Sequence, residues 1–309
     1  MRSPRYIRNL LLATLIAIMV AILFLLIALS KMQLDAFIAP NPSIPGETPE
    51  DYGLSYTELD LIATDGTRLT AWFVPAERAN GSAVVLVHGR GGNRSALLPT
   101  ANILARHGYS LLMLDLRAHG QSEGDVVTYG YYESLDVIAG LTYLVQHPDI
   151  DQHRIGMLGQ SLGGAAVIRA AAQSDIPRAL VVESTFHSLP AAVEDGFNVM
   201  SNLPQWPFAS IVVWQAELAI GIEITELDLA RDLANSTQCP VFLIHGSADE
   251  MLPLHHHLTL VEAANDPKQS WIVEGMGHDS PAVYTPIEYE QRLIEFFDLY
   301  LGENSSINE

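Results

Sequence analysis

Residues 156–164 read Gly-Met-Leu-Gly-Gln-Ser-Leu-Gly-Gly, and they place Ser161 in the pattern G-x-S-x-G. An apolar run that starts at Ile155 leads into this stretch, and residues 165–173 follow it with a helical pattern. A strand, a very tight turn and a helix form the context in which this pattern exposes a serine hydroxyl at the end of a strand. The stretch therefore predicts an α/β fold with a nucleophilic serine at position 161.

Two loops downstream carry the partners that a serine nucleophile needs, a base for its proton and an acid that orients the base. A short apolar strand at 240–245 precedes Asp249, and another at 270–273 precedes His278. Serine, acid, histidine is the chain order that accompanies a serine in a strand–turn–helix. Because the ends of parallel strands meet at one edge of a sheet, we expect Ser161, Asp249 and His278 to converge there.

Other carboxylates compete with Asp249 for the role of the acid. Glu183 ends a strand predicted at 179–183, and we interpret it as a packing or hydrogen-bonding group beneath the serine turn. Glu250 adjoins Asp249, and Asp279 adjoins His278 and would point away from its imidazole. Asp249 itself has a second interpretation, because an aspartate after a strand often caps a following helix.

The remaining histidines and the single cysteine do not fit a catalytic role. His88 and His119 precede the serine and break the chain order. The histidines at 255–257 are consecutive, and consecutive residues do not share a helix face, so we expect a solvated helix start and no metal site. Cys239 precedes an apolar strand, which indicates a packed thiol, and a single cysteine excludes an internal disulfide.

A glycine-rich loop follows the strand predicted at 83–87. Residues 88–93 read HGRGGN, and such a loop leaves a backbone N–H free to bind the oxyanion of a tetrahedral intermediate. We expect the two donors to be the N–H groups of Arg90 and of Leu162, which follows the serine. A plain strand-to-helix turn is the alternative. Phosphate binding is not indicated, because the chain lacks G-x-x-x-x-G-K-[ST] and a complete G-x-G-x-x-G.

Five segments together resemble the α/β-hydrolase superfamily. They are HGRGGN at 88–93, LDLRAHGQSEG at 114–124, GQSLGG at 159–164, HGSADEMLP at 245–253 and GMGH at 275–278. Within the superfamily, the chain is most similar to membrane-anchored bacterial hydrolases related to the serine aminopeptidase and acylglycerol lipase-like groups. The similarity covers about residues 52–301. It implies an α/β-hydrolase fold with a mostly parallel eight-stranded sheet and helices on both faces.

The resemblance also implies roles for individual residues. By position it makes Ser161 the nucleophile, Asp249 the acid and His278 the base, with Arg90 and Leu162 as oxyanion donors. It implies a structural role for the loop at 115–122. No metal or organic cofactor is required by this chemistry.

Strands and helices alternate through most of the chain, which favours a parallel sheet with helices on both faces. Two strands at 54–63 and 68–74 come first, and Asp65-Gly66 between them is a hairpin signal. Helical patterns follow at 95–107, 131–146, 162–173, 254–264 and 287–301.

The stretch at 186–237 breaks this alternation, because it is far longer than an ordinary connection between two strands. We expect it to form a small helical lid over Ser161. Its apolar side chains would line an acyl or aromatic pocket, with Trp206, Phe208 and Trp214 as the candidate pocket residues. The alternative is that these side chains pack on the sheet without touching a substrate.

The N-terminus is typical of a membrane anchor. Residues 10–30 form an uncharged apolar stretch, and about 20 helical residues span the hydrocarbon thickness of a bilayer. The basic arm at 1–9 carries three arginines, so we expect it to be cytoplasmic and the catalytic domain to lie outside. Cleavage as a signal peptide near Ala28-Leu29-Ser30 is the alternative. A buried core helix is not favoured, because the stretch lacks a polar face.

Two further segments complete the predicted organisation. Residues 31–51 contain four prolines, and we interpret them as a stiff linker that holds the domain off the bilayer. The domain itself is expected at 52–301, and the tail at 302–309 is expected to be disordered.

Composition limits the partners. The chain has 309 residues, with 16 basic against 36 acidic side chains and a net charge of −20. Such a chain repels phosphate backbones, so nucleic acid is excluded as a partner. We expect a small-molecule or lipid-like acyl substrate and a membrane contact through the N-terminal helix. The sequence does not indicate an oligomeric state.

These observations favour hydrolysis of carboxylic ester or thioester bonds through an acyl-enzyme. A peptidase would use the same residues, but it also needs a group that holds a peptide terminus, and the sequence does not identify one. A catalytically silent, membrane-tethered binding protein on the same fold is the third interpretation, because fold alone does not fix function.

Overall fold

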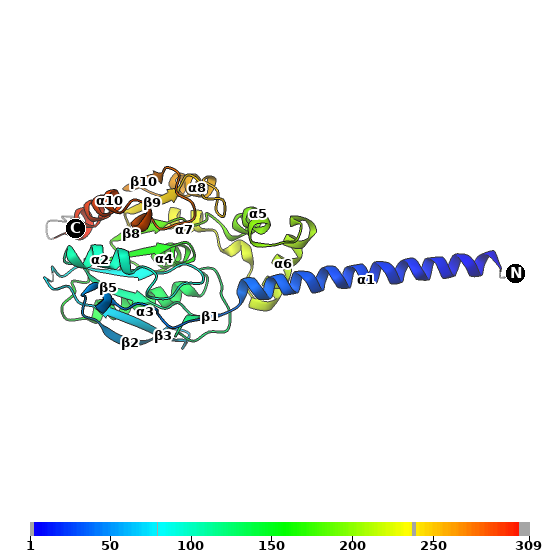
Figure 1. The fold of residues 1–309 in the computed structure, drawn as a ribbon, viewed down its shortest axis with the longest axis horizontal. Coiled ribbons are helices and arrows are strands. Elements are labelled where there is room, and N and C mark those ends of the chain that lie inside the picture. The colour runs from blue at the N-terminus through cyan, green and yellow to red at the C-terminus, as the bar shows by residue number, and fades with distance from the viewer. Residues whose placement is uncertain (1–2, 79, 237–238, 303–309) are drawn as a thin grey trace.

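A computed structural model describes residues 3–78, 80–236 and 239–302. One long helix, α1 (Pro4–Ile38), projects from an α/β domain that holds the rest of the described chain (Figure 1). Residues 303–309 of the predicted tail and Arg2 of the basic arm lie outside the described residues.

The domain is built on a sheet of eight strands in the order β10-β9-β8-β7-β4-β5-β3-β2. Strands β10 to β5 run parallel, and β3 and β2 complete one edge as antiparallel strands. This arrangement confirms the predicted fold. The strands are β2 (Thr57–Ile62), β3 (Arg68–Val74), β4 (Ala83–Val87), β5 (Ser110–Leu114), β7 (Ile155–Gln160), β8 (Ala179–Glu183), β9 (Val241–Gly246) and β10 (Lys268–Val273).

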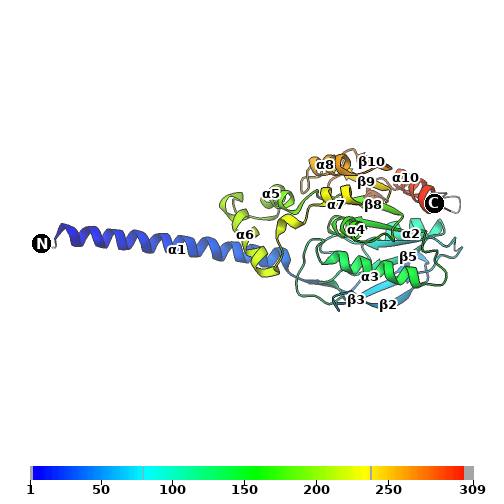
Figure 2. The same cartoon turned by 180° about the vertical axis from the view of Figure 1, so that it is seen from behind.

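Helices cover both faces of the sheet, as predicted, and each face has its own hydrophobic core (Figure 2). One face carries α3 (Glu133–Gln146), α4 (Leu162–Gln173), α7 (Leu229–Asn235) and α8 (His255–Ala263). The other carries α2 (Leu98–Arg106), α9 (Pro281–Tyr284) and α10 (Pro286–Leu301). Strands β4, β5 and β8 are buried along their full length, which is why each contains a run of at least four apolar residues.

The segment predicted as a lid divides into two parts. Helices α5 (Leu189–Met200) and α6 (Gln205–Ile220) lie outside the sheet layers, beside the end of α1 (Figure 1). They are followed by the short helix η2 (Ile224–Glu226). Helix α7 then returns to the sheet and packs on α4 and α8. The lid therefore consists of α5 and α6, and the last part of the predicted insertion is an ordinary crossover helix.

The structure corrects the predicted linker at 31–51. Helix α1 contains the predicted apolar span but continues to Ile38, because the first proline after it is Pro40. The chain beyond it does not stand away from the domain. Strand β1 (Asn41–Pro42) pairs in parallel with β6 (His119–Gly120), and η1 (Pro49–Tyr52) follows. The membrane-span criterion of length and hydropathy is met by α1 alone among the described residues.

The expected solvated start of α8 is also corrected. His256 and His257 are buried, and only His255 is exposed. The Nε2 atom of His257 lies 2.8 Å from Ser270 Oγ and joins α8 to β10. Burial, helped by neighbouring His245, lowers the pKa of His257 to about 4 from the ordinary value of 6.5.

The depressed pKa of His257 predicts a pH-dependent stability. Between about pH 6.5 and pH 4 the unfolded chain binds a proton that the folded chain does not, so stability falls as pH falls through this window. The variant His257→Gln keeps a polar group for Ser270. In this variant we expect the free energy of unfolding to change less steeply with pH, by up to about 1.4 kcal/mol per pH unit. Urea unfolding of the detergent-solubilised full chain across this range measures it. An unchanged slope would contradict the prediction.

The tight packing beneath Ser161 gives a second prediction. A Cβ on Gly163 would lie 2.2 Å from the carbonyl oxygen of Val87, whereas a Cβ on Gly46 would meet nothing within 4 Å. We expect Gly163→Ala to lower the free energy of unfolding by about 1–3 kcal/mol, because the backbone of β4 must move. Gly46→Ala is the matched control and should change it by less than about 0.5 kcal/mol. Equal stability of the two variants in urea unfolding would refute this packing argument.

Candidate active site

Ser161 occupies a strained turn between β7 and α4. Its φ of 53° and ψ of −115° are unusual for a residue with a side chain. The backbone is held from both sides: the Ser161 N–H donates to the carbonyl of Glu183 at 2.8 Å, and the Ser161 carbonyl accepts from Thr185 Oγ1 at 2.7 Å. A Cβ on Gly159 would lie 2.3 Å from the Gly163 carbonyl oxygen, so the turn requires the small residues of the pattern.

The structure brings Ser161, His278 and Asp249 together at the carboxyl edge of the sheet. His278 Nε2 lies 3.0 Å from Ser161 Oγ, and His278 Nδ1 lies 2.8 Å from Asp249 Oδ2. An ionised carboxylate only accepts, so Nδ1 carries the proton and Nε2 is free to accept from the serine hydroxyl. The imidazole is partly exposed, whereas the Asp249 side chain is fully buried.

The loop after β9 holds the Asp249 carboxylate in its ionised form. Asp249 Oδ1 accepts the N–H groups of Met251 at 3.0 Å and of Leu252 at 2.8 Å. Burial alone would raise the pKa of Asp249, but the hydrogen bond and charge of His278, together with the Leu252 N–H, lower it below the ordinary value. The second interpretation of this aspartate, a cap of α8, is not realised, because the residue before that helix is Leu254.

The competing carboxylates lie elsewhere. Glu183 is fully buried and accepts a hydrogen bond from the Tyr289 hydroxyl, and burial raises its pKa to about 7. It therefore lies beneath the serine turn, where the sequence placed it. Glu250 and Asp279 are both exposed, and neither contacts the His278 ring through a hydrogen bond within the described chain.

The loop at 88–93 lies against the serine. A Cβ on Gly89 would be 3.3 Å from Ser161 Cβ. The backbone N–H groups of Arg90 and Leu162 donate to no other group in the described part of the chain, so both remain available to a ligand. Leu162 is also the first residue of α4, where helix N–H groups are unpaired and the helix dipole favours negative charge.

His88 shapes this loop, a role that the sequence analysis missed. Its Nδ1 donates to the Gly89 carbonyl at 2.7 Å, and its Nε2 accepts the Leu116 N–H at 3.2 Å. Burial, together with neighbouring His119, lowers the pKa of His88 to about 3, so the ring stays neutral. A histidine directly before a glycine at the end of a buried strand was the available signal.

The Arg90 side chain connects the same loop to the end of α1. Its guanidinium donates to the carbonyl of Ala36 at 2.7 Å and to that of Phe37 at 2.9 Å. Tyr129 Oη donates to the Phe37 carbonyl at 3.0 Å, and the Val127 N–H donates to the Ile38 carbonyl at 2.9 Å. The last carbonyls of α1, which have no partner within the helix, are therefore bound by groups of the domain.

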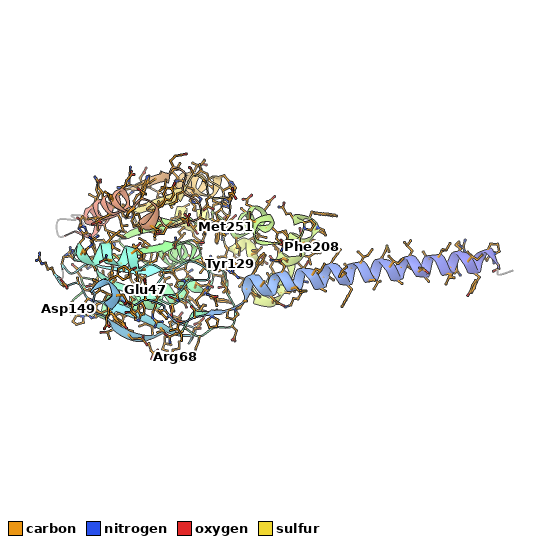
Figure 3. The ribbon with its side chains drawn as sticks, in the orientation of Figure 1. Glu47, Arg68, Tyr129, Asp149, Phe208 and Met251 are labelled. Atoms are coloured by element: carbon orange, nitrogen blue, oxygen red, sulfur yellow. The ribbon has the colours of Figure 1, made fainter. Side chains whose placement is uncertain are left out.

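An apolar cavity opens beside Ser161. Tyr129 and Met251, which both line it, lie between the sheet and the lid (Figure 3). The lid contributes apolar side chains, and so does the end of α1. The principal apolar lining residues are Leu34, Phe37, Ile38, Phe186, Leu189, Val193, Phe197, Val212, Val213, Ile220 and Ile224.

The predicted pocket residues do not line this cavity. Trp206 is 83% exposed and Trp214 is 52% exposed, whereas Phe208 is buried between the lid and α1 with Leu34. The prediction of these three as pocket residues was therefore wrong. Helix α6 is apolar on all sides, so its sequence did not show which face points inward.

A cluster of histidines lies beside the acid loop. The Nε2 atoms of His255 and His256 lie 3.0 and 3.2 Å from Asp195 Oδ2 on α5, and His256 Nδ1 lies 2.9 Å from His187 Nδ1. These three histidines are the group within the described residues whose ring nitrogens could together hold a metal ion. The contacts of His255 and His256 with Asp195 already tie the lid to α8.

Known proteins resemble this chain both in sequence and in structure. The family model described as serine aminopeptidase, S33, matches residues 79–222. Rv2307c of Mycobacterium tuberculosis is 31% identical over 218 residues, which cover 70% of this chain and 70% of that protein. YfhR of Salmonella typhi is 29% identical over 277 residues, which cover 83% of this chain and 86% of that protein.

The solved structures give the same result. The Pyrococcus furiosus esterase Pf2001 has a TM-score of 0.72 and 26% identity, and the match covers 86% of this chain and 99% of the esterase. Together with the sequence relatives, this likeness shows that the chain belongs to the α/β-hydrolase superfamily.

Proposed function

We propose that this protein is a serine hydrolase that cleaves carboxylic ester or thioester bonds by two-step acyl transfer. The observation that carries the proposal is the unbroken chain of hydrogen bonds from Ser161 Oγ through the His278 ring to the Asp249 carboxylate. In this proposal Ser161 is the nucleophile, His278 the general base and Asp249 the group that fixes the tautomer of the ring.

In the first step, His278 Nε2 takes the proton of Ser161 while Oγ forms a bond to the carbonyl carbon of the substrate. The carbonyl oxygen becomes negatively charged and binds the N–H groups of Leu162 and Arg90, each of which lowers the barrier by about 3–4 kcal/mol. The imidazolium that forms is stabilised by ionised Asp249. His278 then gives its proton to the leaving alcohol or thiol as the bond from the acyl carbon breaks.

The second step releases the acyl group. A water molecule gives a proton to His278 Nε2 and attacks the acyl carbon, and the same two N–H groups bind the oxyanion again. His278 returns the proton to Ser161 Oγ as the acyl bond breaks. The products are a carboxylic acid and the free serine. The histidine is partly exposed, which allows water to reach it.

The cavity lining favours an acyl substrate over a peptide. Most of its lining side chains are apolar, and its two charged side chains are already engaged. The Arg90 guanidinium binds the carbonyls that end α1, and Glu217 Oε1 accepts the Ile224 N–H at 3.1 Å. An aminopeptidase needs a free carboxylate for the α-amine of its substrate. Glu217 is the acidic side chain among the described lining residues, and its Oε1 is already bound, so the lining gives less support to the aminopeptidase that the family model's description suggests.

We also propose that α1 spans a membrane, with Arg5 and Arg8 on the cytoplasmic side and the catalytic domain outside. The support is the length and hydropathy of the helix, together with the arginines that precede its apolar span.

Replacement of Ser161 tests the proposed chemistry. We expect a fluorophosphonate to label the wild-type chain but not Ser161→Ala, and we expect hydrolysis of p-nitrophenyl butyrate to fall by at least about 10³-fold in that variant. Ser280→Ala is the matched control, because Ser280 lies in the His278 loop and its side chain makes no helix-capping bond. Undiminished hydrolysis in Ser161→Ala would defeat the proposal, and an unlabelled wild-type protein would favour the silent binding protein.

A second measurement separates esterase from peptidase. We expect p-nitrophenyl esters to be turned over at least about 100-fold faster than aminoacyl anilides, because the apolar lining offers no free charge to a peptide amine. Glu217→Gln should leave the ester rates within about threefold, since the amide oxygen still accepts the Ile224 N–H. Faster turnover of anilides, lost in Glu217→Gln, would establish the peptidase instead.

A further inference from the structure

We infer that α1 is part of the substrate site as well as an anchor, and that the lid docks on the bilayer so that the cavity takes an acyl chain of a membrane lipid directly from it. This inference rests on the proposed serine chemistry, because it names the source of the acyl group that reaches Ser161. Three observations carry it. The end of α1 lines the cavity, the lid contacts α1 within its uncharged part, and the lid exposes aromatic side chains.

The last turns of α1 form one wall of the cavity. Leu34, Phe37 and Ile38 all line it, and Leu34 is almost fully buried. The ring of Phe37 meets the ring of Phe197 on the lid edge to face, with 6.3 Å between their centroids. Lid and helix thus enclose the cavity together, and a chain without this part of α1 would have an open side beside Ser161.

The contacts of α6 place the lid at the level of the membrane surface. The uncharged part of α1 ends at Lys31, which forms an exposed ion pair with Asp35. Gln215 Nε2 on α6 donates to the carbonyl of Ile27 at 3.0 Å. Ile27 lies four residues before Lys31, which places it about 6 Å inside the uncharged part of the helix. If α1 spans a bilayer, α6 therefore reaches the interface between headgroups and hydrocarbon.

The lid presents large apolar side chains at this level. We define the lid surface as the exposed side chains Val199, Trp206, Trp214 and Leu218. Trp214 and Leu218 are four residues apart and share one face of α6, and Trp214 is next to Gln215. Phe208, two residues from Trp206, lies at the end of the lid that points along α1 toward its N-terminus (Figure 3).

A bilayer is the partner that fits this surface. Tryptophan is enriched at membrane interfaces, where its ring contacts hydrocarbon and its N–H remains hydrated. Helix α6, which carries Trp206, Trp214 and Leu218, packs on α1, and α1 has the length and hydropathy of a membrane span. The lipids around α1 would therefore also reach the lid. The ester groups of membrane lipids also lie at this interface.

The proposed reaction is hydrolysis of a lipid ester. The acyl chain would lie between Phe37 and the lid, with its carbonyl carbon at Ser161 Oγ. The bond from the acyl carbon to the alkoxy oxygen of the lipid breaks, and water supplies the hydroxyl of the fatty acid and the proton of the released alcohol. The Arg90 side chain binds the end of α1, and the Arg90 backbone N–H is one of the two proposed oxyanion donors. The same residue therefore connects the cavity wall to the oxyanion site.

The experiment uses the full chain in phosphatidylcholine vesicles that contain diacylglycerol. Fatty-acid release and hydrolysis of soluble p-nitrophenyl butyrate are measured in the same preparation. For the double variant Trp206→Ser, Trp214→Ser we expect at least about a tenfold loss of fatty-acid release, with butyrate hydrolysis within about twofold of the wild type. Ile287→Ser is the matched control, since Ile287 is 85% exposed on α10, away from α1 (Figure 1).

A second variant tests the wall. In Phe37→Ala we expect the ratio of kcat/KM for a palmitoyl ester to that for a butyryl ester to fall by about fivefold or more, because a long chain loses more contact than a short one. An unchanged ratio would overturn the assignment of α1 as a wall of the site.

The outcomes separate this inference from the proposed function. If the wild-type protein hydrolyses neither soluble nor vesicle esters, the proposed function itself fails. If it hydrolyses butyrate but releases no fatty acid, or if the double variant behaves like Ile287→Ser, the docking inference is overturned. If the protein cleaves an S-acylated peptide on the vesicle but releases no fatty acid from the lipids, a membrane lipid is not the ligand of the cavity.

Discussion

The fold of the site depends on one constraint, the close approach of backbone to backbone beneath Ser161. The turn after β7 brings Gly159 close to the carbonyl of Gly163, and Gly163 close to the carbonyl of Val87. At both positions a Cβ atom would overlap the carbonyl oxygen. This crowding gives Ser161 its positive φ, and the hydrogen bond to Glu183 on the neighbouring strand holds it there. Because β4, β7 and β8 are parallel neighbours, the strain is borne by the most buried part of the sheet.

Buried ion pairs secure the loops around this turn. Arg94 and the Gln121 N–H bind the Asp115 carboxylate, and a Cβ on Gly120 would lie within 2.4 Å of three atoms of that carboxyl group. These contacts fold the segment at 115–122 into a compact loop against which β1 pairs. They explain the structural role that the resemblance implied, since both oxygens of the buried carboxylate accept hydrogen bonds.

Most of the fold could be predicted from the sequence, because its signals are local. Strands β3, β4 and β8 and helix α4 have the predicted bounds, since buried runs and helical periodicity need no knowledge of distant residues. The three loops of the site could be predicted to meet for a similar reason: a parallel sheet brings strand ends together whatever their separation in the chain.

The cavity could not be predicted, because it depends on packing between segments that lie far apart in the sequence. The exposed tryptophans of α6 and its inward-facing Val212 and Val213 have similar hydrophobicity, so only their neighbours distinguish them. The histidines of α8 were misjudged similarly. Their partners, Asp195 and His187, come from the lid and the loop after β8, far away in the chain.

The end of α1 is held by groups of the domain. A helix that ends in solvent leaves its last carbonyls to water, but here Arg90 and Tyr129 bind the carbonyl of Phe37. The guanidinium charge faces the negative end of the helix dipole, where a cation is stabilised by about 0.3–1 kcal/mol. Because the same arginine follows Gly89 in the loop that lies against Ser161, this one residue connects the end of α1 to the site. The position of the helix is therefore linked to the loop beside the serine turn by hydrogen bonds as well as by packing.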